Sequence, residues 1–107
     1  MRTNTDPFHA LADPGRRAIL MMLSRDKQSI NTIAGNFDIS RPAISKHVKI
    51  LHEAGLILIK DSGRERYCEL NLDGFEEVKK WLNFFDKFWK TKLQNLEDLL
   101  NQQYKSE

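Results

Sequence analysis

Hydrogen-bond donors cluster at the start of the stretch Ser40 to Gly55, which reads SRPAISKHVKILHEAG. Arg41 and Lys46 can donate to guanine acceptors or to phosphate oxygens, and the hydroxyl of Ser45 can hydrogen-bond to either. Pro42 and Ala43 directly follow Arg41, and they leave the end of a helix that begins here slim enough to enter the major groove of DNA. This pattern predicts a surface that binds DNA, and it leaves open which side chains touch bases rather than phosphates.

The same stretch carries an apolar face. Ile44, Val48 and Leu51 follow one another at spacings of four and three, which predicts an amphipathic helix with one buried face. The opposite face is polar and basic at its first turns: Arg41, Ser45, Lys46 and Lys49. A helix that buries one edge and offers such groups at its N-terminal end is predicted to be a DNA recognition helix.

Two aspartate–proline pairs mark the starts of earlier helices. The carboxylates of Asp6 and Asp13 can accept from the first backbone N–H groups, and the proline after each one fits the first helical position. We expect a short helix at about Pro7 to Leu11 and a longer one at about Pro14 to Leu23. The polar residues from Ser24 to Ser29 are expected to form a connection.

The stretch Ile30 to Phe37 repeats apolar residues at helical spacing, and Ser29 is a suitable cap. Gly35 within this stretch costs roughly 1 kcal/mol relative to alanine in a helix, and a close approach of two helices is one explanation for a glycine here. Asp38 to Ser40 then forms a tight turn before the recognition helix. Two short helices joined by so tight a turn predict a helix-turn-helix over about residues 30–54.

A β-hairpin is expected after Gly55, which suits the C-terminal end of a helix. Leu56 to Asp61 and Tyr67 to Leu72 have strand-like patterns, and Ser62 to Arg66 is expected to form the turn between them. Alternation places three side chains of the second strand on one face: Cys68, Leu70 and Leu72. Directly after a helix-turn-helix, a hairpin over about residues 56–72 is predicted to be a wing.

One long helix is predicted at about Gly74 to Gln103, capped by Asp73. Its apolar residues recur at spacings of three and four, and further aromatic residues widen the stripe. Nearly thirty residues span about 45 Å at 1.5 Å per residue, which exceeds the width of a domain this small. We therefore expect a homodimer that buries the stripe between two copies. The alternative is a binding surface for another protein or an apolar ligand.

Composition sets the outer bounds. The 107 residues predict one domain, 1–107, that is mainly α with a small β-hairpin. A single cysteine allows no intramolecular disulfide, and no apolar run is long enough to cross a membrane, so a cytoplasmic location is expected. The sequence lacks a glycine-rich phosphate loop and any nucleophile with His and Asp partners, so we expect no enzyme.

The positive charge lies in the part that holds the recognition helix. Met1 to Leu72 contain 11 lysines and arginines against 8 aspartates and glutamates, a net charge of +3. Asp73 to Glu107 contain 6 against 7, a net charge of −1. This distribution fits contacts with phosphates, although a difference of a few charges decides little alone.

The order of these elements resembles the ArsR/SmtB family of bacterial winged-helix repressors over about Pro7 to Leu100. The residues that carry the resemblance are ALADPGRRAIL (Ala10 to Leu20), ISRPAISKHVKILHEAGLI (Ile39 to Ile57) and GRERYCEL (Gly63 to Leu70). The closing WLNFFDKFWKTKLQNLEDLL (Trp81 to Leu100) is similar to the metal-independent branch, which includes sporulation-delay-type autorepressors.

The resemblance implies two sets of functional residues. The first set would contact DNA through the recognition helix and the wing: Ser40, Arg41, Pro42, Ala43, Ser45, Lys46, His47, Gly63, Arg64 and Arg66. The polar face of the helix adds Lys49 to the residues predicted to bind DNA. The second set, on the first and last helices, would form the dimer interface: Phe8, Leu11, Trp81, Phe84, Phe85, Phe88, Trp89, Leu93 and Leu96. For His47, packing beside the wing is an equal alternative to a phosphate contact.

The family's two kinds of metal site are not matched in this sequence. One kind places cysteines on the helix before the recognition helix, but Ile30 to Phe37 contain no Cys, His or Asp. The other kind spaces Asp, His and Glu along the last helix, which here holds Glu76, Glu77 and Asp86 but no histidine. We therefore expect no metal and no cofactor.

The leading hypothesis is a homodimeric transcriptional repressor that binds an inverted repeat in double-stranded DNA. Release from DNA could involve a protein anti-repressor on the aromatic stripe. The alternatives are a protein-interaction module that acts through this stripe and a metal-responsive repressor with an atypical site.

Overall fold

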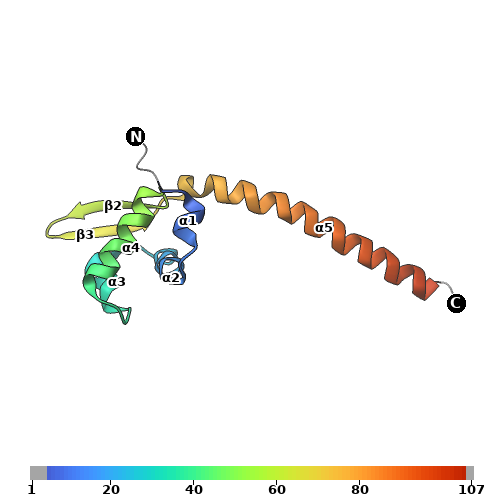
Figure 1. Ribbon diagram of the computed structural model, residues 1–107, viewed down its shortest axis with the longest axis horizontal. Coiled ribbons are helices and arrows are strands. Elements are labelled where there is room, and N and C mark those ends of the chain that lie inside the picture. The colour runs from blue at the N-terminus through green and yellow to red at the C-terminus, as the bar shows by residue number, and fades with distance from the viewer. Residues whose placement is uncertain (1–4, 106–107) are drawn as a thin grey trace. The chain divides into compact units, whose positions relative to one another are not determined.

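A computed structural model describes residues 5–105, and the chain divides into two compact units, Met1–Glu76 and Glu77–Glu107. Along the chain, the elements follow one another as labelled in Figure 1. The helices and strands are α1 (Pro7–Leu11), α2 (Pro14–Leu23), β1 (Gln28–Ser29), α3 (Ile30–Gly35), α4 (Arg41–Glu53), β2 (Ile57–Ser62), β3 (Glu65–Leu70), a 3-10 helix η1 (Leu72–Phe75) and α5 (Glu76–Lys105).

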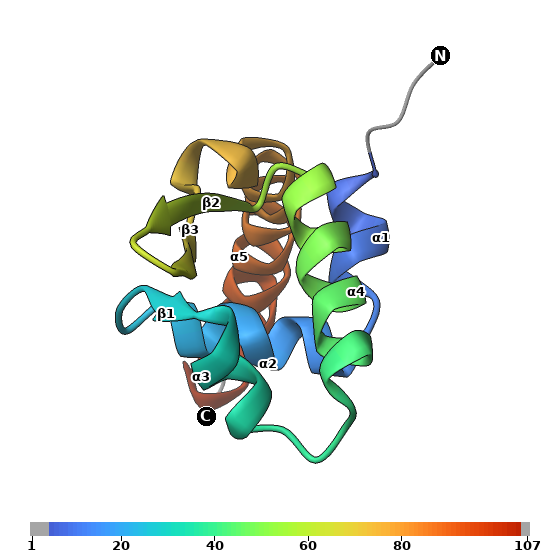
Figure 2. The same cartoon turned by 90° about the vertical axis from the view of Figure 1, so that its left-hand side faces the viewer.

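The first unit is a winged helix-turn-helix. Helix α2 packs against α1 and α4, and α3 packs against α4. The strands form an antiparallel sheet in the order β1-β3-β2, in which the β2–β3 hairpin is the wing. Figure 2 shows α3 and α4 joined by the short turn, with the hairpin beside them. The prediction of a mainly α fold with a winged helix-turn-helix is confirmed.

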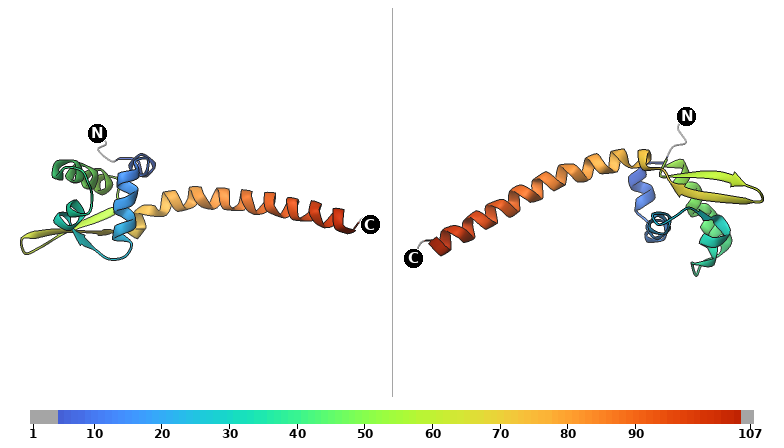
Figure 3. Two further views of the ribbon diagram at one scale, coloured as in Figure 1. Left: turned by 90° about the horizontal axis from the view of Figure 1, so that it is seen from below. Right: turned by 180° about the vertical axis from the view of Figure 1, so that it is seen from behind.

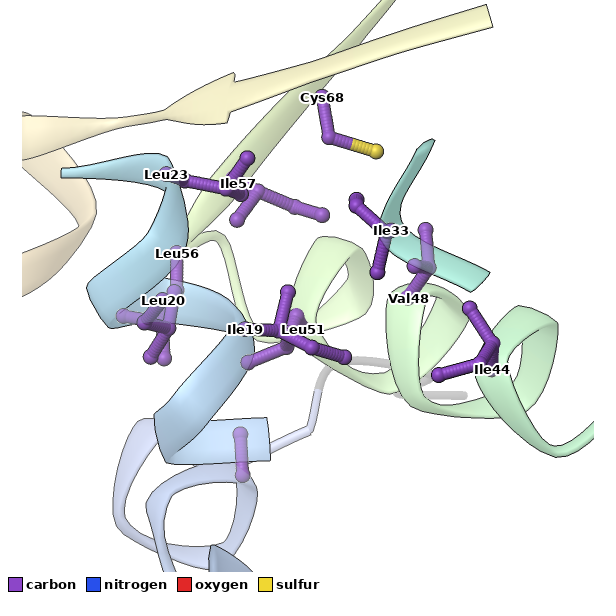
Figure 4. Close-up of a cluster of buried hydrophobic side chains, with 11 residues drawn as sticks. Ile19, Leu20, Leu23, Ile33, Ile44, Val48, Leu51, Leu56, Ile57 and Cys68 are labelled. Atoms are coloured by element: carbon purple, nitrogen blue, oxygen red, sulfur yellow. The ribbon is translucent and has the colours of Figure 1, made fainter. Parts of the chain in front are cut away.

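One apolar core joins the helices of the first unit to the sheet. Figure 4 shows its side chains converging from α2, α3, α4 and the two wing strands. The buried members are Ala10, Ile19, Leu20, Leu23, Ile33, Ile44, Val48, Leu51, Leu56, Ile57 and Cys68. The predicted buried face of the recognition helix is therefore confirmed. Because burial of each large aliphatic side chain contributes about 1.5–3 kcal/mol, this core stabilises the helix that presents the candidate DNA-binding residues.

The helix ends follow local side-chain chemistry. Asp6, Asp13, Ser29 and Ser40 each accept a hydrogen bond from a backbone N–H in the first turn of the next helix. At the other end of α4, Gly55 has a positive φ of 82°. The N–H of Leu56 donates to the carbonyl of Leu51, and that of Gly55 donates to the carbonyl of His52. This pair of bonds is a Schellman motif, so Gly55 ends the helix as predicted.

Three expectations before the recognition helix are corrected. Gln28 and Ser29, expected in a connection, form β1 and pair with Cys68 and Tyr67 of β3. Helix α3 ends at Gly35 rather than near Phe37. No atom outside the neighbouring backbone comes within 4 Å of a Cβ built on Gly35, so this glycine marks no close approach of helices. The strand was missed because it is two residues long and depends on pairing with a distant strand.

Further corrections concern the wing and the last helix. Ser62, Glu65 and Arg66, expected in the turn, belong to the strands, because only Gly63 and Arg64 lie between β2 and β3. Leu72 does not share the buried face of Cys68, since it is exposed in η1. Asp73 also lies inside η1 and therefore does not cap α5, which begins at Glu76 and reaches Lys105.

The second unit consists of most of α5. Figure 3 shows this helix as one uninterrupted ribbon. Edge-to-face contacts join neighbouring aromatic rings on its surface, with ring centroids 4.9 Å apart for Trp81 and Phe85 and 5.7 Å apart for Phe88 and Trp89. Over residues 5–105, no helix has the length and apolar character needed to cross a membrane.

Candidate nucleic-acid interface

The recognition helix α4 offers a polar face opposite its buried one. Ser40 caps this helix, and its hydroxyl accepts a hydrogen bond from the N–H of Ala43 at 3.3 Å. Ala43 itself is half-buried. The exposed residues of the predicted set on this helix are Arg41, Pro42, Ser45, Lys46 and Lys49. Because the core holds the other side of α4, this face is presented to solvent over its first three turns.

The wing presents its charges at the tip of the hairpin. Gly63 adopts a positive φ of 63°, which suits the tight two-residue turn. Arg66 and Asp61 are directly paired across the strands, and Nε of Arg66 donates to Oδ1 of Asp61 at 3.2 Å. Lys60 and Glu69 form a second ion pair at 2.7 Å. Arg66 is therefore partly neutralised by its own hairpin.

The start of α4 and the tip of the wing lie around one hollow. This hollow has a volume of about 190 Å3, and its lining combines residues of α3, α4 and the wing: Ile30, Asn31, Arg41, Arg64, Glu65 and Arg66. Three of the six side chains are arginines from the predicted DNA-binding set. The structure thus brings together side chains that are more than twenty residues apart in the sequence. Asn31, an exposed amide in this lining, was missed because nothing in its local pattern distinguishes it.

His47 points away from the exposed face of α4. Its Nε2 lies 3.7 Å from Oδ2 of Asp13, and its Nδ1 lies 3.5 Å from Nη1 of Arg16. Its side chain retains 19% of its exposure. The alternative of packing beside the wing is therefore wrong, because His47 packs against the start of α2.

Arg16 is a buried charge that the sequence analysis did not single out. It is 8% exposed, and its Nε donates to the carbonyl oxygen of Ala10 at 2.7 Å. A signal for its burial was present, since Arg16 lies three and four residues before the buried Ile19 and Leu20 on the same helical face.

Two electrostatic features accompany these contacts. The carboxylate of Asp13 accepts a hydrogen bond from the backbone N–H of Arg16 at 3.1 Å, and this bond lowers the pKa of Asp13 below its usual value. Cys68 is fully buried in β3, and burial raises the pKa of its thiol. Cys68 is a member of the apolar core by its burial, and a thiol with a raised pKa is a poor nucleophile and metal ligand.

The described residues gather no set of side chains suited to a metal ion. Within residues 5–105, no three His, Cys, Asp or Glu side chains come close enough to hold a metal ion. The residues predicted for a dimer interface lie on α1 and α5. Phe8 and Leu11 are half-buried on α1, whereas the residues of α5 are exposed in the single chain, apart from the half-buried Phe85.

Comparisons with known proteins place this arrangement in a family. Residues 13–58, from the cap of α2 to the start of β2, match the profile of the bacterial regulatory protein, arsR family. The transcriptional repressor SdpR of Bacillus subtilis is 38% identical over 81 residues, which are 75% of this chain and 90% of SdpR. The regulator Rv2034 of Mycobacterium tuberculosis is 32% identical over 94 residues, which are 88% of this chain and 85% of Rv2034.

Solved structures agree with these relatives. The crystal structure of an ArsR family transcriptional regulator superposes with a TM-score of 0.69 at 37% identity, and the match covers 78% of this chain and 91% of that one. An ArsR-like regulator from Rhodococcus sp. RHA1 has a TM-score of 0.65 at 29% identity, with 86% and 87% covered. The match to SdpR agrees with the sporulation-delay branch, and all four proteins are regulators rather than enzymes. The chain belongs to the arsR family of bacterial regulatory proteins and is a DNA-binding transcriptional regulator.

Proposed function

We propose that the protein is a homodimeric repressor that binds an inverted-repeat operator in double-stranded DNA without a metal ligand. The observation that carries this proposal is the hollow shared by Arg41, Arg64 and Arg66. The lining carries three arginines against one glutamate, and its position between the start of a helix and the tip of a wing matches a DNA backbone that passes between a major groove and the next minor groove. The SdpR relative is named a repressor, which supports the same direction of control.

The proposed contacts divide by position. The first turn of α4, from Ser40 to Ala43, enters the major groove with Ser45, Lys46 and Lys49 on its outer side. At the wing, Gly63 and Arg64 approach the minor groove or its phosphates, together with Arg66. His47 contributes by holding α4 in place more than by touching phosphate, because both ring nitrogens face Asp13 and Arg16.

The proposed dimer buries the apolar face of α5. Trp81, Phe84, Phe88, Trp89 and Leu93 are exposed in the single chain, which is a large apolar surface for a monomer. Phe85 and Leu96 share this face, and Phe8 and Leu11 of α1 complete the proposed interface. A two-fold dimer presents two recognition helices to two half-sites one helical turn apart, so the interface is needed for operator binding.

The test begins with selection of bound sites from random double-stranded DNA, followed by footprinting on the selected site. We expect an inverted repeat, salt-dependent affinity and two protected half-sites. Selection that yields no preferred sequence, or only non-specific binding, would contradict the proposal. Zinc or copper added to the complex is expected to leave its affinity unchanged, and a change would favour the metal-responsive alternative.

The second candidate function is a protein-interaction module that acts through α5. It is favoured by an exposed patch on this helix in which two aromatic rings lie beside polar side chains: Phe84, Lys87, Phe88, Thr91, Lys92 and Asn95. Such a patch could receive a protein anti-repressor in the cytoplasm. Light scattering separates the two functions, because a stable monomer with an open aromatic face favours the module and a dimer favours the repressor.

A further inference from the structure

The guanidinium of Arg16 is connected to the helices on both sides of α2. Its Nε donates to the carbonyl oxygen of Ala10 at 2.7 Å, and its Nη2 donates to the carbonyl oxygen of His9 at 3.2 Å. Both carbonyls lie near the C-terminal end of α1, where a positive charge is favourable, and the carbonyl of His9 also accepts from the N–H of Ala12. The third nitrogen, Nη1, lies 3.5 Å from Nδ1 of His47 on α4.

These contacts constrain the ring of His47. An arginine nitrogen only donates, so a hydrogen bond between Nη1 of Arg16 and Nδ1 of His47 forms in the tautomer whose Nδ1 accepts. The other ring nitrogen of His47 faces the carboxylate of Asp13, which is 3.7 Å away. Asp13 is in turn held by the backbone N–H of Arg16. The ring is thus placed between two groups of α2.

A buried guanidinium is costly unless its donors are satisfied. The carbonyls of α1 satisfy two of the donors of Arg16. An arginine does not need to be buried, however, to donate hydrogen bonds to the end of α1. Arg17 shows this directly, because its Nη1 donates to the carbonyl oxygen of Leu11 at 2.8 Å from an exposed position. Arg16 differs from Arg17 in its burial and in its contact with α4.

We propose that Arg16 is a positioning residue for DNA recognition, which sets the rotation of α4 through His47. The proposal rests on the proposed contact between α4 and DNA. His47 directly follows Lys46 and lies two residues after Ser45, so a rotation of α4 about its axis would move both side chains relative to the bases. The core fixes where α4 lies, and the Arg16–His47 contact adds a directional constraint that apolar packing lacks.

The experiment compares Arg16→Lys with Arg17→Lys in the full chain. Both changes keep the charge and remove the planar fork, but only Arg16→Lys removes the contact with α4. The affinities for the selected operator and for an unrelated duplex are measured, with the salt dependence of each. Thermal unfolding of both variants shows whether they fold.

We expect Arg16→Lys to weaken operator binding roughly tenfold, in the range of coupling between contacting side chains, while binding to the unrelated duplex stays within about twofold. The slope of affinity against salt is expected to be unchanged, because Arg16 is buried and contacts no phosphate. Arg17→Lys is expected to leave the ratio of specific to non-specific affinity as in the wild type.

A double-mutant cycle with His47→Ala supplies a second readout. If Arg16 acts through His47, the effects of Arg16→Lys and His47→Ala on operator affinity are less than additive. Additive effects, or equal losses on the operator and on the unrelated duplex, would overturn the proposal. If Arg16→Lys does not fold, His47→Ala alone tests the proposal, because this change must lower the ratio of operator affinity to affinity for the unrelated duplex. Failure of the wild-type protein to select any DNA site would contradict the proposed function instead.

Discussion

Nε of Arg66 lies 3.2 Å from Oδ1 of Asp61, the residue directly opposite it in the wing. The carboxylate competes with DNA phosphate for this guanidinium. We therefore expect Asp61→Asn to raise DNA affinity several-fold at low salt and to steepen the salt dependence by up to about one unit. Fluorescence anisotropy with a labelled duplex at several salt concentrations measures both quantities.

The matched control for Asp61→Asn is Glu69→Gln on the same hairpin. Glu69 pairs with Lys60 at 2.7 Å, so this change removes the same charge from the wing and leaves Arg66 with its partner. If the carboxylate of Asp61 acts by pairing with Arg66, Asp61→Asn raises DNA affinity more than Glu69→Gln does. Equal increases in affinity would mean that the net charge of the wing alone is responsible.

Arg64 and Arg66 are expected to differ in their contribution to DNA binding. Arg64→Ala should weaken binding to all sequences and reduce the salt slope by about one. Arg66→Ala should reduce the slope by less, because Asp61 already neutralises part of its charge. The salt dependence of Kd checks both, with Arg25→Ala in the connection after α2 as the control. A slope unchanged by Arg64→Ala would remove the wing from the DNA interface.

Gly74 and Gly35 are expected to respond to alanine in opposite directions. A Cβ on Gly74 would clash with the carbonyl oxygen of Gly55, which also accepts a hydrogen bond from the side-chain amide of Asn71 at 2.8 Å. Gly74→Ala should therefore lower the free energy of unfolding by about 1–3 kcal/mol. Gly35→Ala, in open space at the end of α3, should raise it by up to about 1 kcal/mol.

Thermal or urea unfolding of both glycine variants measures these changes. A change of 1 kcal/mol moves Tm by roughly 4–8 °C in a domain of this size. Equal stability of Gly74→Ala and the wild type would show that η1 can move away from the end of α4 at little cost.

Lys92 interrupts the apolar face of α5, four residues after Phe88 and four before Leu96. Its Nζ lies 5.3 Å from the centroid of the Phe88 ring. In a helix seam, one such lysine selects a register at a cost in stability. We expect Lys92→Leu to tighten self-association about tenfold or to add larger oligomers. Analytical ultracentrifugation over a concentration series measures this.

The control for Lys92→Leu is Lys90→Leu, which lies off the apolar face and pairs with Asp86 at 3.2 Å. It should leave self-association close to that of the wild type. If both variants associate equally, the added apolar area rather than its place on the helix controls assembly. Weaker association of Lys92→Leu would place Lys92 in a favourable contact across the interface.

Local sequence chemistry was enough to predict most helix positions and the buried face of α4. The caps at Asp6, Asp13 and Ser40 and the positive φ at Gly55 involve only residues within about one helical turn. Hydrophobic spacing likewise reports which side of a helix is buried, since residues three and four apart share a face. The family resemblance rested on the same local patterns.

Tertiary structure decided what depends on distant neighbours. The two residues of β1 become a strand only because β3, about forty residues later, supplies their hydrogen-bond partners. The burial of Arg16 requires the end of α1 and His47 of α4 at the same point. Arg41 lines a hollow with Arg64 because the core holds α4 beside the wing. The spacing of hydrophobic residues shows which face of a single helix or strand is buried. The pairing of β1 with β3, the contact of Arg16 with His47 and the hollow shared by Arg41 and Arg64 depend instead on how separate elements pack together.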